Sequence, residues 1–289
     1  MMKNTLLTIL TVLVFAYALK VLFFPSDDVS HGPEQTVLQR VIGNDVIRCA
    51  YASYPVMLDI NPNTGELSGI FYDIMTEIGK RADIDVKWVE EVGYGNINQG
   101  LVTGRYDLFC AGLWPSTNRA RNTVFSQPLF YDPVTVWVRH DDARFDDDLT
   151  KLNAPEYKIS VIDGDANQTM ADALFPQAGR VSMSHNQTIA DQINQVTSGR
   201  ADAVFTDLIT GMKYIQNNPE SIKNVQPGKP VFMYPLTIGM KEGAYGMKTF
   251  LDTAIRELKD DGTIEQIIKN HMGENSDYFY FKQTKYAPY

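Results

Sequence analysis

Short apolar runs alternate with amphipathic stretches over most of the chain. The first set reads as a strand over 46–52, a helix over Gly69–Ala82, a strand over 84–91, a short helix over Ile97–Thr103 and a strand over 105–113. Strands that alternate with helices are typical of a parallel sheet, because parallel strands need long crossover connections. The first set therefore predicts an α/β lobe.

A second set follows a polar break. Strands are expected over 157–163, 180–184 and 200–207, and helices over 168–176, 188–199 and 208–218. Two long extended segments, 128–139 and 230–240, stand before and after this set, and two helices, Tyr245–Lys259 and Ile264–Met272, end the pattern. Two α/β sets joined by two extended crossings predict two lobes connected by a two-strand hinge. We expect lobe 1 over 44–137 with 236–275, lobe 2 over 138–235, and an aromatic tail over 276–289.

The N-terminal segment over 1–25 has a different character. Thr5–Phe24 is an almost unbroken apolar run that Lys3 precedes, and about 20 such residues can span a bilayer as a helix. The flanking charges place the N-terminus in the cytoplasm and the rest outside. An Ala-x-Ala sequence at 16–18 is a signal-peptidase site, but cleavage there leaves an apolar new N-terminus, which favours an uncleaved anchor. Both interpretations predict export, with 26–43 as a polar linker.

Composition and charge exclude several classes of function. The formal net charge of −9, with no basic stripe, argues against nucleic-acid binding. The four histidines are scattered and neither cysteine has metal-ligand spacing, so we expect no metal and no cofactor. Cys49 and Cys110 lie in apolar, strand-like runs. Buried thiols are the expected state, although export also permits a disulfide.

Two stretches carry a family resemblance. Residues 104–131 (GRYDLFCAGLWPSTNRARNTVFSQPLFY) resemble the signature of the family 3 extracellular solute-binding proteins, with these positions in register: Gly104, Tyr106, Asp107, Ala111, Gly112, Arg119, Phe125, Ser126 and Pro128. Residues 198–207 (SGRADAVFTD) resemble a second motif of that family. Looser likeness extends the match, in the correct order, over about residues 45–273. The resemblance implies a type II periplasmic-binding-protein fold whose lobes close on a ligand, as periplasmic binding proteins do.

The resemblance also implies a clamp for an amino acid. Arg119 would bind the ligand carboxylate, since guanidinium offers two parallel donors, although a surface arginine remains the alternative. Asp207 would pair with the ligand ammonium at the end of a strand, where α/β sheets usually bind ligands. Its alternative role is to cap the helix that follows, and both roles can coexist.

Four further residues are expected at the site. Gly112 would let backbone groups approach the ligand. The Ser116 hydroxyl would donate a hydrogen bond to the ligand carboxylate, with a local turn as its alternative role. Trp114 departs from the family pattern and would replace an aromatic wall, or else pack in the core. Tyr54 begins a Tyr-Pro-Val-Met stretch that also departs from the pattern at Met57.

The loop at 164–167 is a further departure. Family members usually have a Gly-Thr/Ser pair there, whereas this chain has Asp165 and Asn167. An acid near the pocket would favour a cationic ligand such as a basic amino acid, and helix capping is the alternative for both residues.

The leading hypothesis is a non-enzymatic periplasmic binding protein that captures an amino acid for the membrane subunits of an ABC importer. An uncleaved N-terminal segment would hold it at the inner membrane. A tethered sensory protein is the second hypothesis. The third is a dehydratase on the same fold, which needs a cleft carboxylic acid such as Asp59, Glu66 or Asp165.

Overall fold

A computed structural model of the chain describes residues 35–184 and 187–273. The chain divides into two compact units, Met1–Gln35 and Thr36–Tyr289, and the following concerns the second unit. The expected N-terminal helix and the aromatic tail over 276–289 lie outside the described residues. Within the described part, none of the helices has both the length and the apolar character that crossing a membrane requires.

The first lobe is built on parallel strands. Its central strands are β1 (Val46–Tyr51), β4 (Asp85–Glu91) and β5 (Leu108–Leu113), with β1 between the other two. The hairpin of β2 (Asp59–Ile60) and β3 (Leu67–Ser68) stands apart, and the helices are α2 (Val37–Asn44), α3 (Ile70–Ala82), α4 (Ile97–Thr103), α8 (Tyr245–Asp260) and α9 (Thr263–Met272). A short 3-10 turn, η1 (Arg119–Arg121), follows β5 and leads into β6 (Thr123–Phe125).

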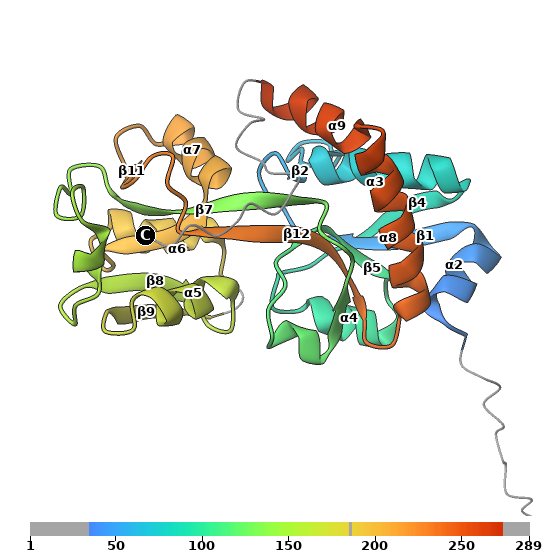
Figure 1. Cartoon of the computed structure of the whole chain (residues 1–289), viewed down its shortest axis with the longest axis horizontal. Coiled ribbons are helices and arrows are strands. Elements are labelled where there is room, and N and C mark those ends of the chain that lie inside the picture. Colours follow the sequence, from blue (N-terminus) through green and yellow to red (C-terminus); the bar gives the residue numbers. More distant parts are fainter. Residues whose placement is uncertain (1–34, 185–186, 274–289) are drawn as a thin grey trace, which may run out of the picture. The chain divides into compact units, whose positions relative to one another are not determined.

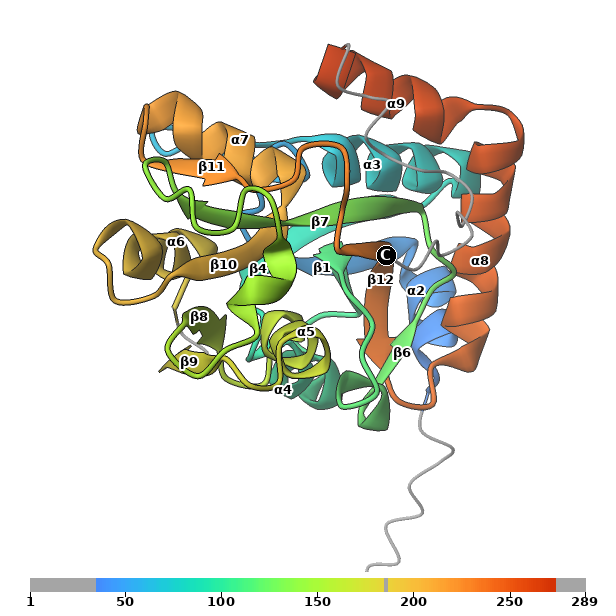
Figure 2. The ribbon, with the colours of Figure 1, turned by 60° about the vertical axis from the view of Figure 1, so that its left-hand side comes forward.

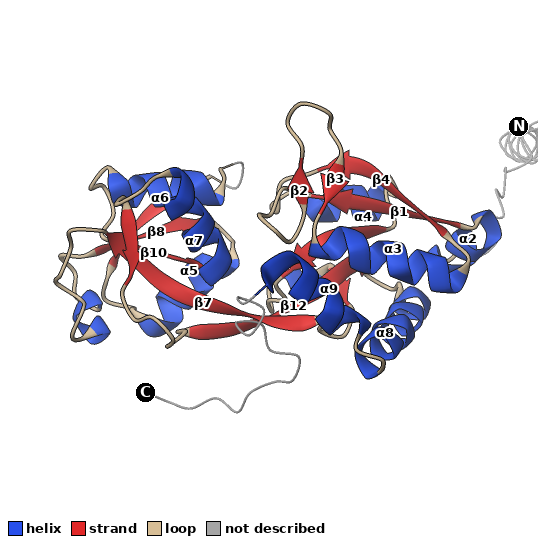
Figure 3. Cartoon of the chain, turned by 90° about the horizontal axis from the view of Figure 1, so that it is seen from above, coloured by secondary structure: helices blue, strands red, loops and turns tan. Residues whose placement is uncertain are grey.

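The second lobe repeats this arrangement with a different segment of chain. Strands β8 (Lys158–Ile162), β9 (Gly179–Met183) and β10 (Ala203–Asp207) pair in parallel, with β8 in the middle. The remaining elements are the 3-10 turn η2 (Leu149–Leu152), helices α5 (Ala166–Leu174), α6 (Ile189–Thr197) and α7 (Leu208–Asn217), and strand β11 (Ile222–Asn224). Helices pack against the strands in both lobes (Figure 3).

Two long antiparallel strands connect the lobes. β7 (Phe130–Arg139) and β12 (Phe232–Lys241) run side by side from one lobe to the other (Figure 1). β7 continues along β10, whereas β12 continues along β5 and β6. Pro133 and Pro235 lie in the paired part of these strands and have no backbone N–H to donate to the ladder. The predicted two-strand hinge is therefore present.

Helix α2 corrects one sequence interpretation. We expected residues 26–43 to be a polar linker, but the described part of that segment contains α2, with Thr36 as N-cap in a capping box. Val37 and Val41 are buried one turn apart, and Arg40 forms an ion pair with the buried carboxylate of Asp107. Figure 2 shows α2 beside α8. The helix belongs to the first lobe because this apolar edge and this ion pair attach it there.

The two cysteines correct a second expectation. The sequence favoured buried thiols, but Cys49 and Cys110 form a disulfide, with their Cα atoms 5.6 Å apart. They lie on β1 and β5, which pair in parallel with Cys49 opposite Leu108, so the two side chains are near neighbours across the ladder. Both are fully buried. The disulfide thus ties two central strands of the first lobe together inside its core.

The buried apolar residues form separate clusters in the two lobes. One cluster draws its members from residues 37–130 and 236–272, together with Ile209. Two others draw theirs from residues 134–234. The first lobe is therefore assembled from both ends of the unit, and the second from one continuous stretch between the two crossings.

Candidate ligand-binding site

A cavity of about 490 Å³ is lined by residues of both lobes. Its lining includes six of the seven residues that the sequence predicted for the site: Tyr54, Gly112, Trp114, Arg119, Asp165 and Asp207. The carboxyl ends of β5 and β10 open toward it, since Gly112 lies near the end of β5 and Asp207 ends β10. Ligands of α/β sheets bind at such strand ends, so this cavity is the candidate site.

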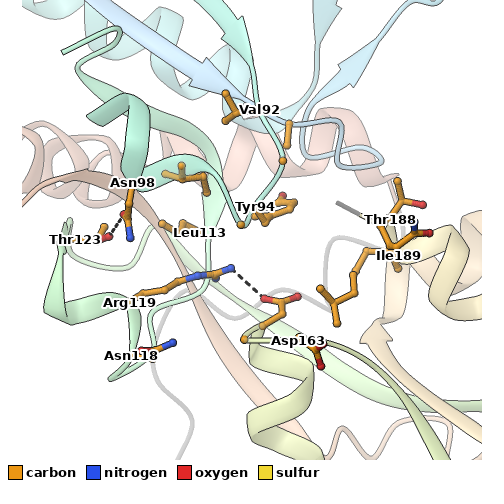
Figure 4. Close-up of a pocket in the computed structure, with 18 of the residues that line it drawn as sticks. Val92, Tyr94, Asn98, Leu113, Asn118, Arg119, Thr123, Asp163, Thr188 and Ile189 are labelled. Carbon is orange, nitrogen blue, oxygen red and sulfur yellow. Dashed lines mark hydrogen bonds and ion pairs between the residues drawn. The ribbon is translucent and has the colours of Figure 1, made fainter. Parts of the chain in front are cut away.

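Arg119 and Asp165 meet across the cavity. The Nη2 atom of Arg119, in the first lobe, is 3.0 Å from Oδ1 of Asp165, in the second. Both side chains are largely buried, at 14% and 19% exposed, and Nη1 of Arg119 donates to the Trp114 carbonyl at 3.1 Å. In Figure 4, Arg119 extends into the cleft and a dashed line marks this ion pair. The guanidinium is therefore engaged by a carboxylate of the protein itself.

Asp207 caps the helix that follows it and also lines the cavity. Its Oδ1 accepts a hydrogen bond from the backbone N–H of Thr210 at 2.7 Å, which caps α7. The residue is only 2% exposed, yet it lines the cavity. Burial raises the pKa of its carboxyl, and the hydrogen bonds from Thr210 and Thr206 oppose that shift. The helix cap thus holds this acid in place at the cavity wall.

Aromatic rings form another part of the wall. Trp114 stacks on Tyr234 of β12, with ring centroids 4.6 Å apart and planes 11° apart. Trp114 packs against the apolar clusters of both lobes, and its indole Nε1 is buried with no hydrogen-bond partner among the described residues. The indole therefore packs between the cores of the two lobes and also lines the cavity.

Gly112 permits the close packing behind the site. Its φ of 84° lies in the left-handed region, and a Cβ atom there would be 2.6 Å from Cε2 of Phe71. Neither condition suits a residue with a side chain. The glycine lets the end of β5 pass against the Phe71 ring.

Asp132 and Tyr94, which the sequence did not single out, lie beside Tyr54 at this site. The hydroxyl of Tyr54 donates to Oδ2 of Asp132 at 2.7 Å, and Asp132, on β7, is completely buried. Burial is the main cause that raises the pKa of Asp132 well above its usual range, and the nearby Asp207 adds to it. Burial and the same two acids, with Tyr94, raise the pKa of the Tyr54 phenol. Tyr54, Tyr94, Asp132 and Asp207, here named the acidic floor, are thus close neighbours.

A second cavity adjoins the first. It has a volume of about 660 Å³ and shares six lining residues with the first cavity: Ser53, Tyr94, Arg119, Asp165, Thr188 and Ile189. Glu91 and Asp163 add acids to its lining. The Arg119–Asp165 pair therefore stands where the two cavities meet, and acids outnumber cations in the lining of the second cavity.

Comparison with known sequences decides the family. Residues 47–274 match the bacterial extracellular solute-binding proteins, family 3. The chain belongs to this family. The putative ABC transporter arginine-binding protein 2 of Escherichia coli K12 is 23% identical over 218 residues, which are 75% of this chain and 86% of that protein.

Solved structures agree on the fold of this family 3 protein. An ancestral arginine-binding protein bound to arginine superposes with a TM-score of 0.67 at 22% identity, over 79% of this chain and 99% of the other. The ancestral amino acid-binding protein AncCDT-1, a precursor of cyclohexadienyl dehydratase, gives 0.68 at 22% identity, over 81% and 98%. These likenesses establish the two-lobed periplasmic-binding-protein fold.

Three predicted or suspected residues of this family 3 protein do not line either cavity. Ser116 instead accepts the backbone N–H of Arg119 at 3.3 Å, which is the local turn that the sequence allowed. Met57 is fully buried in the core of the first lobe. Asn167 is buried and donates to the Gln192 side chain at 3.0 Å, within the second lobe. No cluster of metal-binding side chains occurs within residues 35–184 and 187–273.

The sequence held one signal for the missed acid of this solute-binding protein. Asp132 is the single charged residue in the apolar run 128–138 (PLFYDPVTVWV). A lone acid in a buried strand needs a partner, because an unpaired buried charge is costly. The lone acid therefore indicated a buried polar contact on this hinge strand.

Proposed function

We propose that this chain is an extracytoplasmic binding protein that captures an amino acid between its lobes and presents it to the membrane subunits of an ABC importer. The observation that carries the proposal is that Arg119 and Asp207 line one cavity from opposite lobes. A guanidinium and a carboxylate at the two ends of a cavity complement the two charges of a zwitterion. The names of relatives support the same ligand class, since the similar Escherichia coli protein is called arginine-binding.

The charges of the site favour a basic amino acid. Asp165 and Asp207 line the cavity, against Arg119 and Lys213 as its cations, and Arg119 is already paired with Asp165. Asp132 adds a third acid directly behind Tyr54. A ligand with one carboxylate and two cationic groups meets this arrangement better than a neutral or acidic amino acid does.

A thermal-shift measurement with the common L-amino acids tests the proposal. A ligand that binds only the folded state at 100 times its Kd stabilises that state by about 2.7 kcal/mol. We expect L-arginine or another basic amino acid to raise the melting temperature. Arg119→Ala should remove this shift and keep the circular dichroism of the folded protein, while Arg121→Ala, at an exposed neighbour, should leave it unchanged. A panel without any stabilising amino acid would contradict the proposal.

We also propose that the protein has no enzymatic role. Asp59 and Glu66, considered above as acids of a dehydratase, lie on the exposed β2–β3 hairpin and line neither cavity. Asp165 is held by Arg119, and Asp132 has no exposed surface from which to protonate a substrate. Turnover of prephenate would refute this proposal.

Tethering at the inner membrane completes the proposal. The apolar run Thr5–Phe24 is long enough to span a bilayer, and an anchored binding protein would stay near its importer. Mass spectrometry of the mature N-terminus separates the two interpretations, since an intact Thr5–Phe24 supports the anchor and cleavage after Ala18 supports a signal peptide.

A further inference from the structure

Asp132 is an acid without a charged partner in the centre of the molecule. Its side chain is fully buried on β7. The Tyr54 hydroxyl lies 2.7 Å from Oδ2, while Oδ1 is buried and has no hydrogen-bond partner among the residues that the structure describes. A carboxylate in such surroundings is strongly disfavoured compared with the neutral acid.

The sheet brings Asp132 close to Asp207. Asp207 pairs with Val134 across β10 and β7, and Asp132 lies two residues from Val134 on the same strand. Side chains two apart on a strand, and side chains directly opposite, project from the same face. The two acids therefore project from one face of the sheet as diagonal neighbours.

The two carboxyls differ in the groups that donate hydrogen bonds to them, and this difference decides which carboxyl is protonated. Asp207 caps α7 and accepts the Thr210 N–H, and both features favour its charged form. Asp132 has only the Tyr54 phenol. Hence Asp207 is the better site for the negative charge and Asp132 the better site for a proton.

The groups that act on Asp132 carry no positive charge, whereas Lys213 lines the same cavity as Asp207. The groups that act on Asp132 are Asp207 and Tyr54, and both acids in turn raise the pKa of Tyr94. The charges of Arg119 and Asp165 act on the pKa of Tyr94 and on that of Tyr234, which lies opposite Asp132 on β12. The four residues of the acidic floor thus supply two carboxyls and two phenols, and within this set a proton is the charge that can compensate the pair.

We propose that Asp132 and Asp207 hold one shared proton in the ligand-free protein, and that a cationic group of the ligand, an ammonium or guanidinium bound beside Asp207, displaces that proton to solvent. The proposal rests on the binding function proposed above. The floor carries a net charge of −1 before binding, from two carboxylates and a proton, and −1 afterwards, from two carboxylates and the ligand cation. Only an O–H bond breaks, and water or buffer takes the proton. Asp132 is a positioning residue that acts through Asp207 and Tyr54.

Calorimetric titration with L-arginine in two buffers of different ionisation enthalpy measures the proton. We expect about one proton released per ligand bound. Below the pKa of the pair, Kd should fall about tenfold for each unit of rising pH, because binding then removes one proton. Asp132→Asn should still bind L-arginine, but binding should release no proton and Kd should not depend on pH in this range. Asp163→Asn, which removes an acid from the adjoining cavity, should keep both the proton release and the pH dependence of Kd. Binding without proton release, or an unchanged slope in Asp132→Asn, would overturn the proposal.

A ligand-free measurement separates this proposal from the binding function. A raised pKa in the folded state means that stability is complete near about pH 4, where unfolded aspartate ionises, and is lost as pH rises through the folded pKa. The free energy of unfolding in urea should therefore fall relative to Asp132→Asn over that interval. If the wild type and Asp132→Asn stay parallel, the shared proton is refuted even when L-arginine binds. If the two free energies of unfolding diverge with pH but no amino acid binds, the shared proton is supported and the proposed binding function is contradicted.

Discussion

At the residue scale, the Arg119–Asp165 pair places a protein carboxylate where a ligand carboxylate would bind. The two groups are 3.0 Å apart and largely buried. Asp165 also caps α5 through its bond to the Ala166 N–H, so it is anchored to the second lobe. A ligand must therefore share Arg119 with Asp165 or displace it, and this competition belongs to the specificity of the site.

Asp165→Asn tests the competition. Asparagine keeps an N-cap but removes the charge, so Arg119 becomes free for a ligand carboxylate, and the site loses an acid that attracts cations. The Kd ratio of L-glutamine to L-arginine should change in favour of L-glutamine by about fivefold, corresponding to about 1 kcal/mol. Isothermal titration of both ligands measures it. Asp172→Asn, at the exposed acid of a surface ion pair, is the control, and a ratio unchanged in Asp165→Asn would contradict the expectation.

Gly112→Ala tests the backbone behind the site. The substitution combines a left-handed φ with a Cβ atom 2.6 Å from Phe71, and we expect a loss of about 2 kcal/mol in the free energy of unfolding. Gly104→Ala is the matched control, because Gly104 has a φ of 71° with open space around it. It should cost about 1 kcal/mol. Urea unfolding of both variants compares them, and equal losses would mean that Phe71 moves aside freely.

Residue types in short motifs predicted much of the candidate site. Arg119, Asp207 and Gly112 were found from motif positions, although two other positions of the first motif serve structure: Tyr106 donates to the Ile97 carbonyl and Asp107 binds Arg48. Asp132 was missed because its role depends on strand register across β7 and β10, which a single sequence does not encode locally. Ser116 closes a local turn and lines neither cavity; the sequence left both roles open because a hydroxyl that closes a turn and one that binds a ligand can occupy the same position.

At the scale of elements, the alternation of strands and helices was predicted well, since each has a clear apolar period. The short strands β2, β3, β6 and β11 were not predicted, and neither was helix α2. Its eight residues bury only Val37 and Val41, a pattern too short to distinguish from a polar linker. Tertiary contacts, above all the Arg40–Asp107 pair, decide its structure.

The disulfide gives a prediction at this scale. Cys49 and Cys110 are 61 residues apart, and closing a loop of that length stabilises a fold by about 4 kcal/mol in the chain-entropy model. Replacing both cysteines with alanine should lower the free energy of unfolding by roughly that amount, measured by urea unfolding under oxidising conditions. Each single replacement should cost nearly as much as both together. Adding reductant should weaken the wild type but leave the double variant unaffected, and a wild type insensitive to reductant would argue against the bond.

At the scale of the whole unit, β7 and β12 are the connection about which the lobes can move. The two strands pair with each other between the lobes, and the cavity that both lobes line would give a ligand contacts with both. We expect saturating L-arginine to lower the radius of gyration in small-angle scattering. Arg119→Ala should show no such decrease, and a wild-type radius unchanged at saturation would contradict closure.

The order of the chain through the two lobes has a consequence for biosynthesis. The apolar cores of the second lobe lie within residues 134–234, so this lobe is complete as soon as that stretch has been made and exported. By then Cys49 and Cys110 of the first lobe have also been exported, but the core of this lobe still lacks the residues of β12, α8 and α9. Domains tend to fold as units while the chain emerges. The N-terminal lobe is therefore the last to mature, and a chain truncated before residue 236 would leave a folded second lobe attached to an unfinished, aggregation-prone first one.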